Sequence, residues 1–172
     1  MFMDPKNTTK DLTENPLVRS RMKALLTERP FSLEPAGMIK GVTFVNDSAA
    51  TNAMAVIESL SHFEEPIVWI TEANDPGFEL DDYTELLRDK VKAVVVYGEH
   101  TARWHDALWD YLGFFVKANS WDETIELSLE IAKANDTVIF SPGCRASEPF
   151  SNFRERGAYF NQLLKIKANA KG

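Results

Sequence analysis

Residues 141–157, SPGCRASEPFSNFRERG, combine the features of a loop that holds an anion. The apolar, β-branched run 137–140 stops at Pro142 and Gly143, and apolar residues then recur at helical spacing from Phe150 onward. A strand therefore leads through a loop into a helix. The free backbone N–H groups at such a helix start favour a carboxylate or a phosphate. Most strand-loop-helix joints are simple connections, so this stretch needs support from a second one.

The second stretch is VNDSAATN at residues 45–52, which also lies where a predicted strand ends and a predicted helix begins. Its short polar side chains are Asn46, Asp47, Ser48, Thr51 and Asn52. One such residue is enough to cap a helix. Five of them indicate that some contact a ligand or shape the wall of a cleft.

Other common chemistries find no support in the sequence. No Gly-Lys dipeptide occurs and the eight glycines never fall as GxGxxG, which excludes both familiar phosphate loops. His62, His100 and His105 have no nearby cluster of cysteines or carboxylates, so we predict surface or capping roles for them and no metal site. Cys144 is expected to be a small loop thiol rather than a nucleophile, and no serine lies in a GxSxG elbow.

The charge and the apolar runs narrow the classes of partner. Lys and Arg number 19 against 26 Asp and Glu, a net charge of −7 without a basic stripe, so we expect no nucleic-acid partner. Apolar runs such as 94–97 are far shorter than the roughly 18 residues of a spanning helix. Residues 1–16 lack the apolar core of a signal peptide. We therefore expect no membrane insertion and a cytoplasmic location.

The elements that position both stretches follow from the apolar pattern. A chain of 172 residues has the length of a single domain. An Asn-Pro cap precedes an amphipathic helix that we predict over about 16–28. Residues 31–47 then predict a hairpin that turns near 35–37, or an extended pair with Gly41 as a bulge.

Helices and strands alternate in the rest of the chain. Helical spacing marks 53–60, 83–87, 104–112 and 123–132, and short apolar runs mark strands at 66–71, 91–98, 113–118 and 137–140. Ser120 and Glu123 form a capping box for the last of these helices. Helices between strands imply βαβ units, and continuous apolar strands imply burial on both faces. The predicted fold is α/β: a Rossmann-like, three-layer domain with a mainly parallel sheet over residues 31–172, preceded by a tail and an N-terminal helix in residues 1–30.

Together the two stretches resemble a pattern of the Mur-type peptide ligases. The C-terminal domain of these enzymes has a hairpin, then GV…NDSKATN, then a βα series, and finally SPxCAS…F.NFE.RG. The chain has GVTFVNDSAATN at 41–52 and SPGCRASEPFSNFRERG at 141–157. The similarity covers about residues 31–168 and is strongest to the ligases that add D-glutamate. The pair of motifs is specific, whereas either motif alone is not.

The resemblance implies a domain that closes over a separate ATP-binding domain and presents an amino acid to an acyl phosphate during peptidoglycan precursor synthesis. It implies that Asp47 contacts the nucleotide ribose and that Thr51 and Phe153 line the amino-acid pocket. The serine of the family's CAS triplet falls on Ala146, with Ser147 one place later. The N–H groups of the helix start there would hold the substrate carboxylate. ATP and magnesium are implied only through this family.

The chain departs from the family at its cationic positions. Ala49 stands where NDSKATN has lysine, and Ser32 stands where the hairpin has an arginine beside the match to Glu34. Residues 71–78, TEANDPGF, replace a loop with two glycines and a substrate-binding lysine. Arg145 is an additional cation that could partly replace one of these charges. The sequence therefore predicts a degenerate form of the family's site.

Two functional hypotheses follow. In the first, the chain is a free-standing homologue of the amino-acid-presenting domain and binds a small carboxylated ligand, such as an amino acid, without catalysing ligation alone. Its predicted ligand-binding residues are Asp47, Ser48, Thr51, Asn52, Ser141, Arg145, Ser147 and Phe153. In the second, the fold is a non-catalytic scaffold for a protein partner or a homo-oligomer. An enzyme active alone is least favoured, because the family's phosphate loop and metal ligands lie in a central domain; we assign no catalytic residue.

Overall fold

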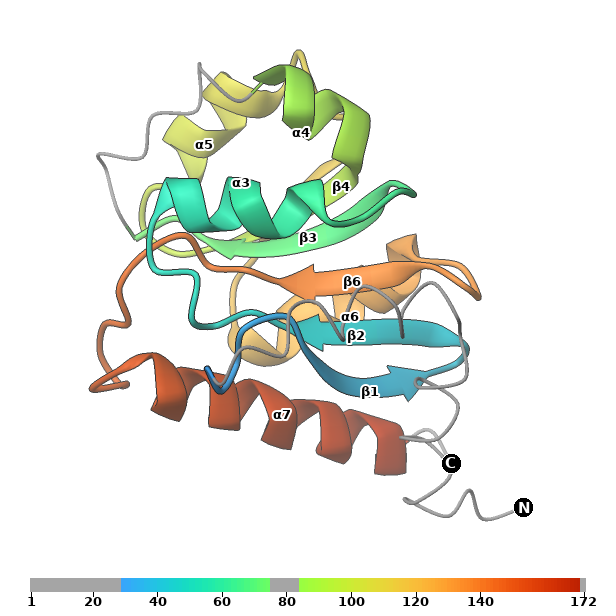
Figure 1. Ribbon diagram of the computed structural model, residues 1–172, viewed down its shortest axis with the longest axis vertical. Helices are drawn as coiled ribbons and strands as arrows, with labels where there is room; N and C mark the ends of the chain where they lie inside the picture. Colours follow the sequence, from blue (N-terminus) through green and yellow to red (C-terminus); the bar gives the residue numbers. More distant parts are fainter. Residues whose placement is uncertain (1–28, 75–83, 171–172) are drawn as a thin grey trace.

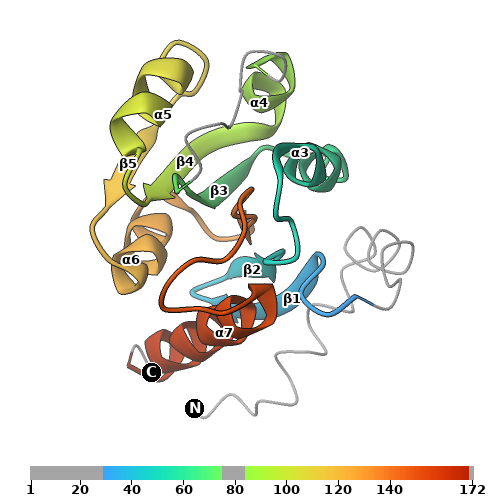
Figure 2. The same cartoon turned by 90° about the vertical axis from the view of Figure 1, so that its left-hand side faces the viewer.

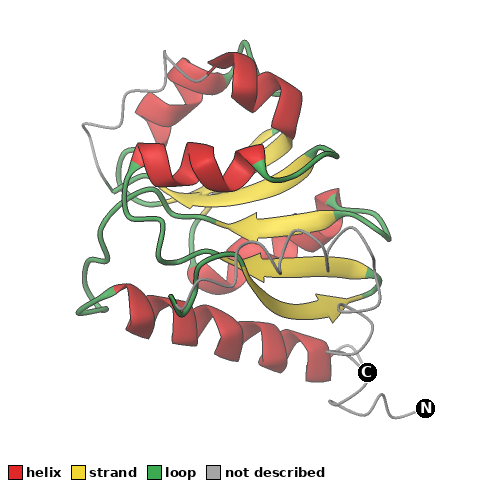
Figure 3. Ribbon diagram, viewed as in Figure 1, coloured by secondary structure: helices red, strands yellow, loops and turns green. Residues whose placement is uncertain are grey.

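A mostly parallel sheet forms the centre of the structure (Figures 1 and 3). The computed structural model describes residues 29–74 and 84–170. Within these residues, six strands pair in the order β1-β2-β6-β3-β4-β5. The strands are β1 (Glu34–Ile39), β2 (Val42–Asn46), β3 (Ile67–Glu72), β4 (Val91–Tyr97), β5 (Phe115–Ala118) and β6 (Thr137–Phe140). The helices are α3 (Ala53–Ser61), α4 (Thr84–Lys90), α5 (Thr101–Leu108), α6 (Trp121–Ile131) and α7 (Phe153–Ala170).

The path of the chain creates a switch point in the middle of the sheet. From β2 the chain passes through α3 to β3, leaving a place for β6, and then runs outward through α4 and α5 to β5. It returns through α6 to β6, which pairs in parallel with both β2 and β3. In open α/β sheets, ligands bind at the carboxyl edge of the strands beside such a switch point. This edge is on the left in Figure 1, and Figure 2 looks onto it.

Helices cover both faces of the sheet, which confirms the predicted three-layer α/β fold. α3, α4 and α5 pack on one face, and α6 and α7 pack on the other (Figure 2). The whole length of β3 is buried, as its continuous apolar run predicts. The carboxyl edge therefore remains as the place where loops from the centre of the sheet reach the surface.

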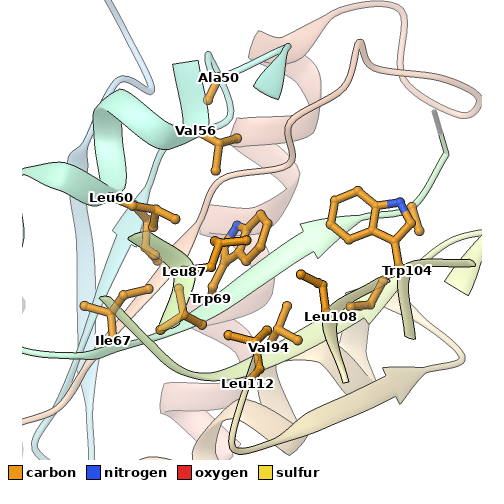
Figure 4. Close-up of a cluster of buried hydrophobic side chains, with 14 of the residues drawn as sticks. Ala50, Val56, Leu60, Ile67, Trp69, Leu87, Val94, Trp104, Leu108 and Leu112 are labelled. Carbon is orange, nitrogen blue, oxygen red and sulfur yellow. The ribbon is translucent and has the colours of Figure 1, made fainter. Parts of the chain in front are cut away.

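The core under α3, α4 and α5 is built around Trp69 of β3 (Figure 4). The ring centroids of Trp69 and Trp104 lie 5.8 Å apart, and Val56, Leu60 and other aliphatic side chains close the layer. The Trp69 Nε1 donates a hydrogen bond to the backbone oxygen of Ser141 at 2.8 Å. A buried indole usually finds such a partner for its N–H group. Here the partner is the first residue after β6, so the core also fixes the start of that loop.

On the opposite face, α7 is held by aromatic packing. Phe160 of α7 stacks on Phe140 of β6 with 4.6 Å between centroids, and Trp121 of α6 meets Phe140 edge to face at 5.3 Å. Phe150, which the sequence pattern assigned to the following helix, lies in the loop before α7 and packs on Trp121 at 5.8 Å. These contacts determine where the first turn of α7 meets the sheet.

The hairpin formed by β1 and β2 differs from both predicted forms. It turns at Lys40 and Gly41, whose φ angles are 51° and 78°. A two-residue turn of this kind requires positive φ at both central positions. The predicted turn at 35–37 is wrong because these residues lie within β1, where the register shifts between Pro35 and Gly37. An edge strand tolerates Pro and Gly, so these residues did not mark a turn.

Two helix starts follow the expected capping chemistry. The Ser120 Oγ accepts a hydrogen bond from the Glu123 backbone N–H at 3.2 Å, as the predicted capping box requires for α6. The Asn52 Oδ1 accepts from the Ala55 N–H at 2.9 Å and caps α3. Both helices therefore begin where short polar side chains satisfy their first N–H groups.

The predictions for the first 30 residues are not tested by the structure. The helix over about 16–28 lies outside the described residues, and the boundary between 1–30 and 31–172 stays a prediction. Among the helices of the described part, none is both long enough and apolar enough to cross a membrane.

Candidate functional site

The two polar stretches lie side by side at the carboxyl edge of the sheet. β2 and β6 pair in parallel with Asn46 opposite Phe140, so the loops that follow them start together. Two backbone hydrogen bonds continue the contact: Asp47 N donates to Phe140 O at 2.7 Å, and Gly143 N donates to Ala50 O at 2.9 Å. The structure thus brings together the two segments that the sequence singled out.

Asp47 and Ser141 lie beneath this surface and bind each other. Asp47 is 1% exposed; its Oδ2 accepts from Ser141 Oγ at 2.6 Å, and its Oδ1 accepts from the Leu33 backbone N–H at 3.1 Å. Burial raises the pKa of Asp47 to about 6, and hydrogen bonds from Ser141, Ser59 and Leu33 offset part of this effect. The Ser141 bond joins the loop after β2 to the loop after β6, and the Leu33 bond joins it to the segment before β1. Contact with a ligand would require them to open.

Ser48 connects the same loop to α7. Its Oγ donates to the backbone oxygen of Phe153 at 2.8 Å, and its N–H donates to Asn46 Oδ1 at 3.1 Å. The Asn46 Nδ2 in turn donates to Gly157 O and to Asn161 Oδ1, both at 2.8 Å. Ser48 and Asn46 are fully buried. The loop after β2 is therefore fixed against the first turns of α7.

Sequence analysis missed Arg156, a fully buried residue in the first turns of α7. Its Nε donates to Ser48 Oγ at 3.1 Å, and its Nη2 donates to the backbone oxygens of Ser48 at 2.9 Å and Cys144 at 3.0 Å. Its Nη1 lies 3.5 Å from Glu72 Oε1 and 3.9 Å from Cys144 Sγ. One guanidinium therefore contacts the loop after β2, the end of β3 and the loop after β6.

A signal for Arg156 was present in the sequence. It stands three residues after Phe153 and four before Phe160, on the apolar face of the predicted helix. Charged residues are almost never fully buried unless they are paired. A cation on that face therefore indicates an internal partner, and the partner here is Glu72 at the carboxyl end of β3.

The groups around Arg156 carry shifted pKa values. Burial raises the pKa of Glu72, and the nearby positive charge of Arg156 opposes the shift. Burial and the neighbouring Glu72 raise the pKa of the Cys144 thiol to about 12. The buried thiol stays protonated and makes a contact of 3.6 Å with Glu72 Oε2. This environment does not favour nucleophilic chemistry at Cys144.

The other predicted residues reach the surface of the edge. Arg145, Ser147 and Asn52 are exposed, whereas Thr51 and Phe153 are half-buried. Their roles also differ. Asn52 caps α3, and the Ser147 Oγ accepts from the Asn74 Nδ2 at 3.3 Å. The Phe153 ring lies under the Arg154 guanidinium at 5.0 Å. The exposed residues could contact a ligand while the buried ones hold their loops.

The start of α7 is capped by its own loop. The Asn152 Oδ1 accepts from the N–H groups of Arg154 at 2.9 Å and Glu155 at 3.0 Å, and the Glu155 Oε2 accepts from the Ser151 N–H at 2.8 Å. A ligand carboxylate at these N–H groups would have to displace Asn152. Cationic side chains such as Arg145 are therefore the more accessible partners for an anion.

Gly157 allows the segment before β1 to approach α7. A Cβ atom at this position would lie 2.7 Å from Cγ of the Phe31 ring. The Phe31 backbone oxygen also accepts a hydrogen bond from the Ala49 N–H at 2.9 Å. The Arg-Gly pair of the second motif thus has two structural roles: the arginine joins three segments, and the glycine makes room for a fourth.

Metal chemistry has no donor set in the described part of the chain. No group of three or more His, Cys, Asp or Glu residues is placed there to hold a metal ion. His105 instead contacts the rings of Trp109 and Phe115, at 4.8 and 5.1 Å between centroids. Every buried side-chain N or O atom in this part has a hydrogen-bond partner. These residues do not fit a resident magnesium ion, and no chemical step of the chain is assigned to magnesium or ATP.

Comparison with known proteins confirms the resemblance. No protein-family model matches the chain. Over 133 residues it is 32% identical to the UDP-N-acetylmuramoylalanine–D-glutamate ligase of Desulfitobacterium hafniense, covering 77% of this chain and 29% of the relative. The structure of the Thermotoga maritima MurF ligase in complex with ADP matches with a TM-score of 0.53 at 21% identity, over 83% of this chain and 33% of that chain. Mycobacterium tuberculosis folylpolyglutamate synthase, complexed with ADP, matches with a TM-score of 0.55 at 17% identity, over 78% and 32% of the two chains.

The fold is therefore the α/β fold found in one part of these ligases. By sequence, the chain is a homologue of the Mur-type ligases, with similarity to UDP-N-acetylmuramoylalanine–D-glutamate ligases. It spans about three tenths of the length of the curated relatives that it matches.

Proposed function

We propose that the chain is a counterpart of the amino-acid-presenting C-terminal domain of the Mur ligases and binds a small carboxylated molecule at the carboxyl edge of its sheet. The observation that carries this proposal is the position of Arg145. Its exposed side chain belongs to the loop between β6 and α7, and the Gly143 N–H to Ala50 O bond joins that loop to the loop after β2. A guanidinium binds a carboxylate through two parallel, charge-assisted hydrogen bonds.

The base of the edge supports the same proposal. Asp47, Ser48, Ser141 and Arg156 are buried and bound to one another or to neighbouring loops. They hold the loops in place before a ligand arrives, so less ordering entropy is lost on binding. Thr51, Arg145, Ser147 and Phe153 then supply the outer contacts.

The proposed role is binding and orientation rather than ligation. Within the 172 residues no phosphate loop occurs, so activation of an acyl group by ATP is assigned to a separate ligase domain. This chain would present its ligand to such a domain, or report the ligand's concentration as a regulatory module. An amino acid fits both roles because its carboxylate is held while its amine stays free to react.

The proposal predicts that Arg145→Ala weakens binding of the carboxylated ligand by about 10-fold or more, because one charge-assisted hydrogen bond contributes about 1.5–3 kcal/mol. Isothermal titration calorimetry with D-glutamate, other amino acids and a UDP-muramoyl peptide measures this change. Lys165→Ala is the matched control: it removes an exposed cation from the C-terminal half of α7. The C-terminal end of this helix lies away from the carboxyl edge (Figure 1). Equal affinities of the folded Arg145→Ala and wild-type proteins would refute the proposal.

A second function, a protein-interaction scaffold, is favoured by a different part of the surface. Trp109 and Phe114 are each 59% exposed; Trp109 follows the last residue of α5, and Phe114 directly precedes the edge strand β5. Large exposed aromatic side chains are common at association surfaces. If this surface joins two copies, Trp109→Ala should lower the molecular mass measured by sedimentation equilibrium. A wild-type protein that stays monomeric at high concentration would exclude the homo-oligomer.

A further inference from the structure

The two loops that carry the proposed ligand contacts share one buried donor. Arg156 Nη2 donates to the Ser48 carbonyl at 2.9 Å and to the Cys144 carbonyl at 3.0 Å. Ser48 begins the segment that leads to Thr51, and the Cys144 carbonyl forms the peptide bond to Arg145. A single planar nitrogen therefore fixes the distance between the backbones of both loops.

We propose that Arg156 is a positioning residue: its guanidinium sets the loop at 47–52 relative to the loop at 141–152, and thereby places Arg145 for the ligand. The ligand part of this inference rests on the proposed function. The coupling of the two loops does not, because it follows from contacts within the protein.

The distances identify the loops, rather than Glu72, as the main partners of Arg156. Its bonds to the two carbonyls are 2.9 and 3.0 Å, whereas the closest contact to Glu72 is 3.5 Å. Charge-assisted N–H···O⁻ bonds are usually about 2.7–2.9 Å, so the ion pair is the looser interaction. Arg156 thus binds mainly to backbone carbonyls of the two loops and is not simply the counter-ion of a buried carboxylate.

The shape of the arginine side chain is needed for these contacts. Arginine has five N–H donors in a rigid fork, whereas the lysine ammonium carries three on one rotating atom. Lysine at position 156 would keep the charge but could not bind Ser48, Cys144 and Glu72 in the same geometry. Arg156→Lys therefore keeps the positive charge but removes the bonds that position the loops, so it tests the two effects separately.

Amide hydrogen exchange followed by NMR tests the coupling without any ligand. In Arg156→Lys we expect exchange at Ala50 and at Gly143, one amide from each loop, to rise by about tenfold or more. Exchange at Val94 in the buried strand β4 should stay within about twofold of wild type. Arg154→Lys makes the same chemical change two residues earlier on an exposed side chain and should alter neither loop.

Three results would overturn the proposal: no increase in either loop, an increase in one loop only, or an equal increase in β4, which would mean that Arg156 only stabilises the whole fold. If Arg156→Lys does not fold, Ser48→Ala removes one acceptor of the guanidinium, and the same three outcomes decide.

Calorimetry then tests the ligand part of the proposal. If wild type binds a carboxylate, folded Arg156→Lys should bind it at least about fivefold more weakly; unchanged affinity would refute the placement of Arg145. A wild-type protein that binds nothing would refute the proposed function while leaving the exchange result intact.

Discussion

At the scale of single residues, the carboxyl edge of the sheet has two kinds of side chain. Some hold its loops in place through internal hydrogen bonds, and others reach the surface, where a ligand could contact them. Asp47, Ser48 and Ser141 were all predicted to contact a ligand, and the structure places them in internal hydrogen bonds. Residue type alone could not separate these roles, because a polar side chain at a strand end caps a loop as readily as it faces a cleft. Burial decides, and burial depends on the position of α7.

The buried Arg156–Glu72 pair predicts a large loss of stability when one partner is removed. Arg156→Met removes the cation that faces the Glu72 carboxylate and the N–H donor of the Ser48 and Cys144 carbonyls. We expect the free energy of unfolding to fall by about 3–5 kcal/mol, the usual cost of breaking a buried pair. Urea denaturation measures it, with Arg154→Met at the exposed position two residues away as the control. A loss similar to that of the control would contradict the assigned role of Arg156.

The raised pKa of Asp47 predicts a distinct pH dependence. The folded protein binds a proton at Asp47 with a pKa of about 6, against an ordinary value of 3.8. Between these values the folded state holds more protons than the unfolded state, so this group's contribution to stability falls as pH rises from about 4 to 6. Asp47→Asn removes the effect. We therefore expect Asp47→Asn to gain about 2 kcal/mol relative to wild type between pH 4 and 7.

Urea denaturation of both proteins across this pH range provides the measurement. Glu72 also has a raised pKa, but it is present in both proteins and cancels in the difference. A difference in unfolding free energy that does not change with pH would show that Asp47 titrates normally.

At the scale of elements, the sequence pattern located most helices and strands because each has one periodicity, and two of the helices also have a clear capping residue. Ser120 and Asn52 begin α6 and α3 as capping chemistry requires. The hairpin was placed wrongly because Pro35 and Gly37 resemble a turn, while the true turn needs positive φ at Lys40 and Gly41. The sequence therefore has a turn signal at both places, and the pairing of β1 with β2 selects the second.

The packing of the segment before β1 against α7 predicts a clash at Gly157. In Gly157→Ala the new Cβ would meet Cγ of the Phe31 ring at 2.7 Å, so the ring and its loop must move. We expect a loss of about 1–3 kcal/mol, typical of overpacking a well-filled site. Thermal unfolding monitored by circular dichroism measures the change. Gly113→Ala, whose Cβ would meet only the Lys92 carbonyl at 3.4 Å, is the control and should cost much less.

A second substitution isolates the cause. Phe31→Ala removes the ring that Gly157 accommodates, so Gly157→Ala should cost less in that background. An unchanged cost in the absence of the ring would assign the requirement for glycine to something other than Phe31.

At the scale of the whole molecule, strand order creates the site. The two polar stretches are about 90 residues apart in the sequence, yet β6 inserts between β2 and β3 and brings them together. Helix and strand periodicity predicted the layers but not this order. The motif resemblance predicted that the stretches belong together, whereas the contacts of Arg156 emerge only when both loops and the end of β3 are assembled.

The most direct test of the proposed binding site is a titration of ¹⁵N-labelled protein with carboxylated amino acids, followed by two-dimensional NMR. If the carboxyl edge binds the ligand, shifts should cluster at residues 48–52 and 143–153 and be lost in Arg145→Ala but not in Lys165→Ala. Shifts confined to other surfaces, or none at millimolar ligand, would contradict the proposed binding site.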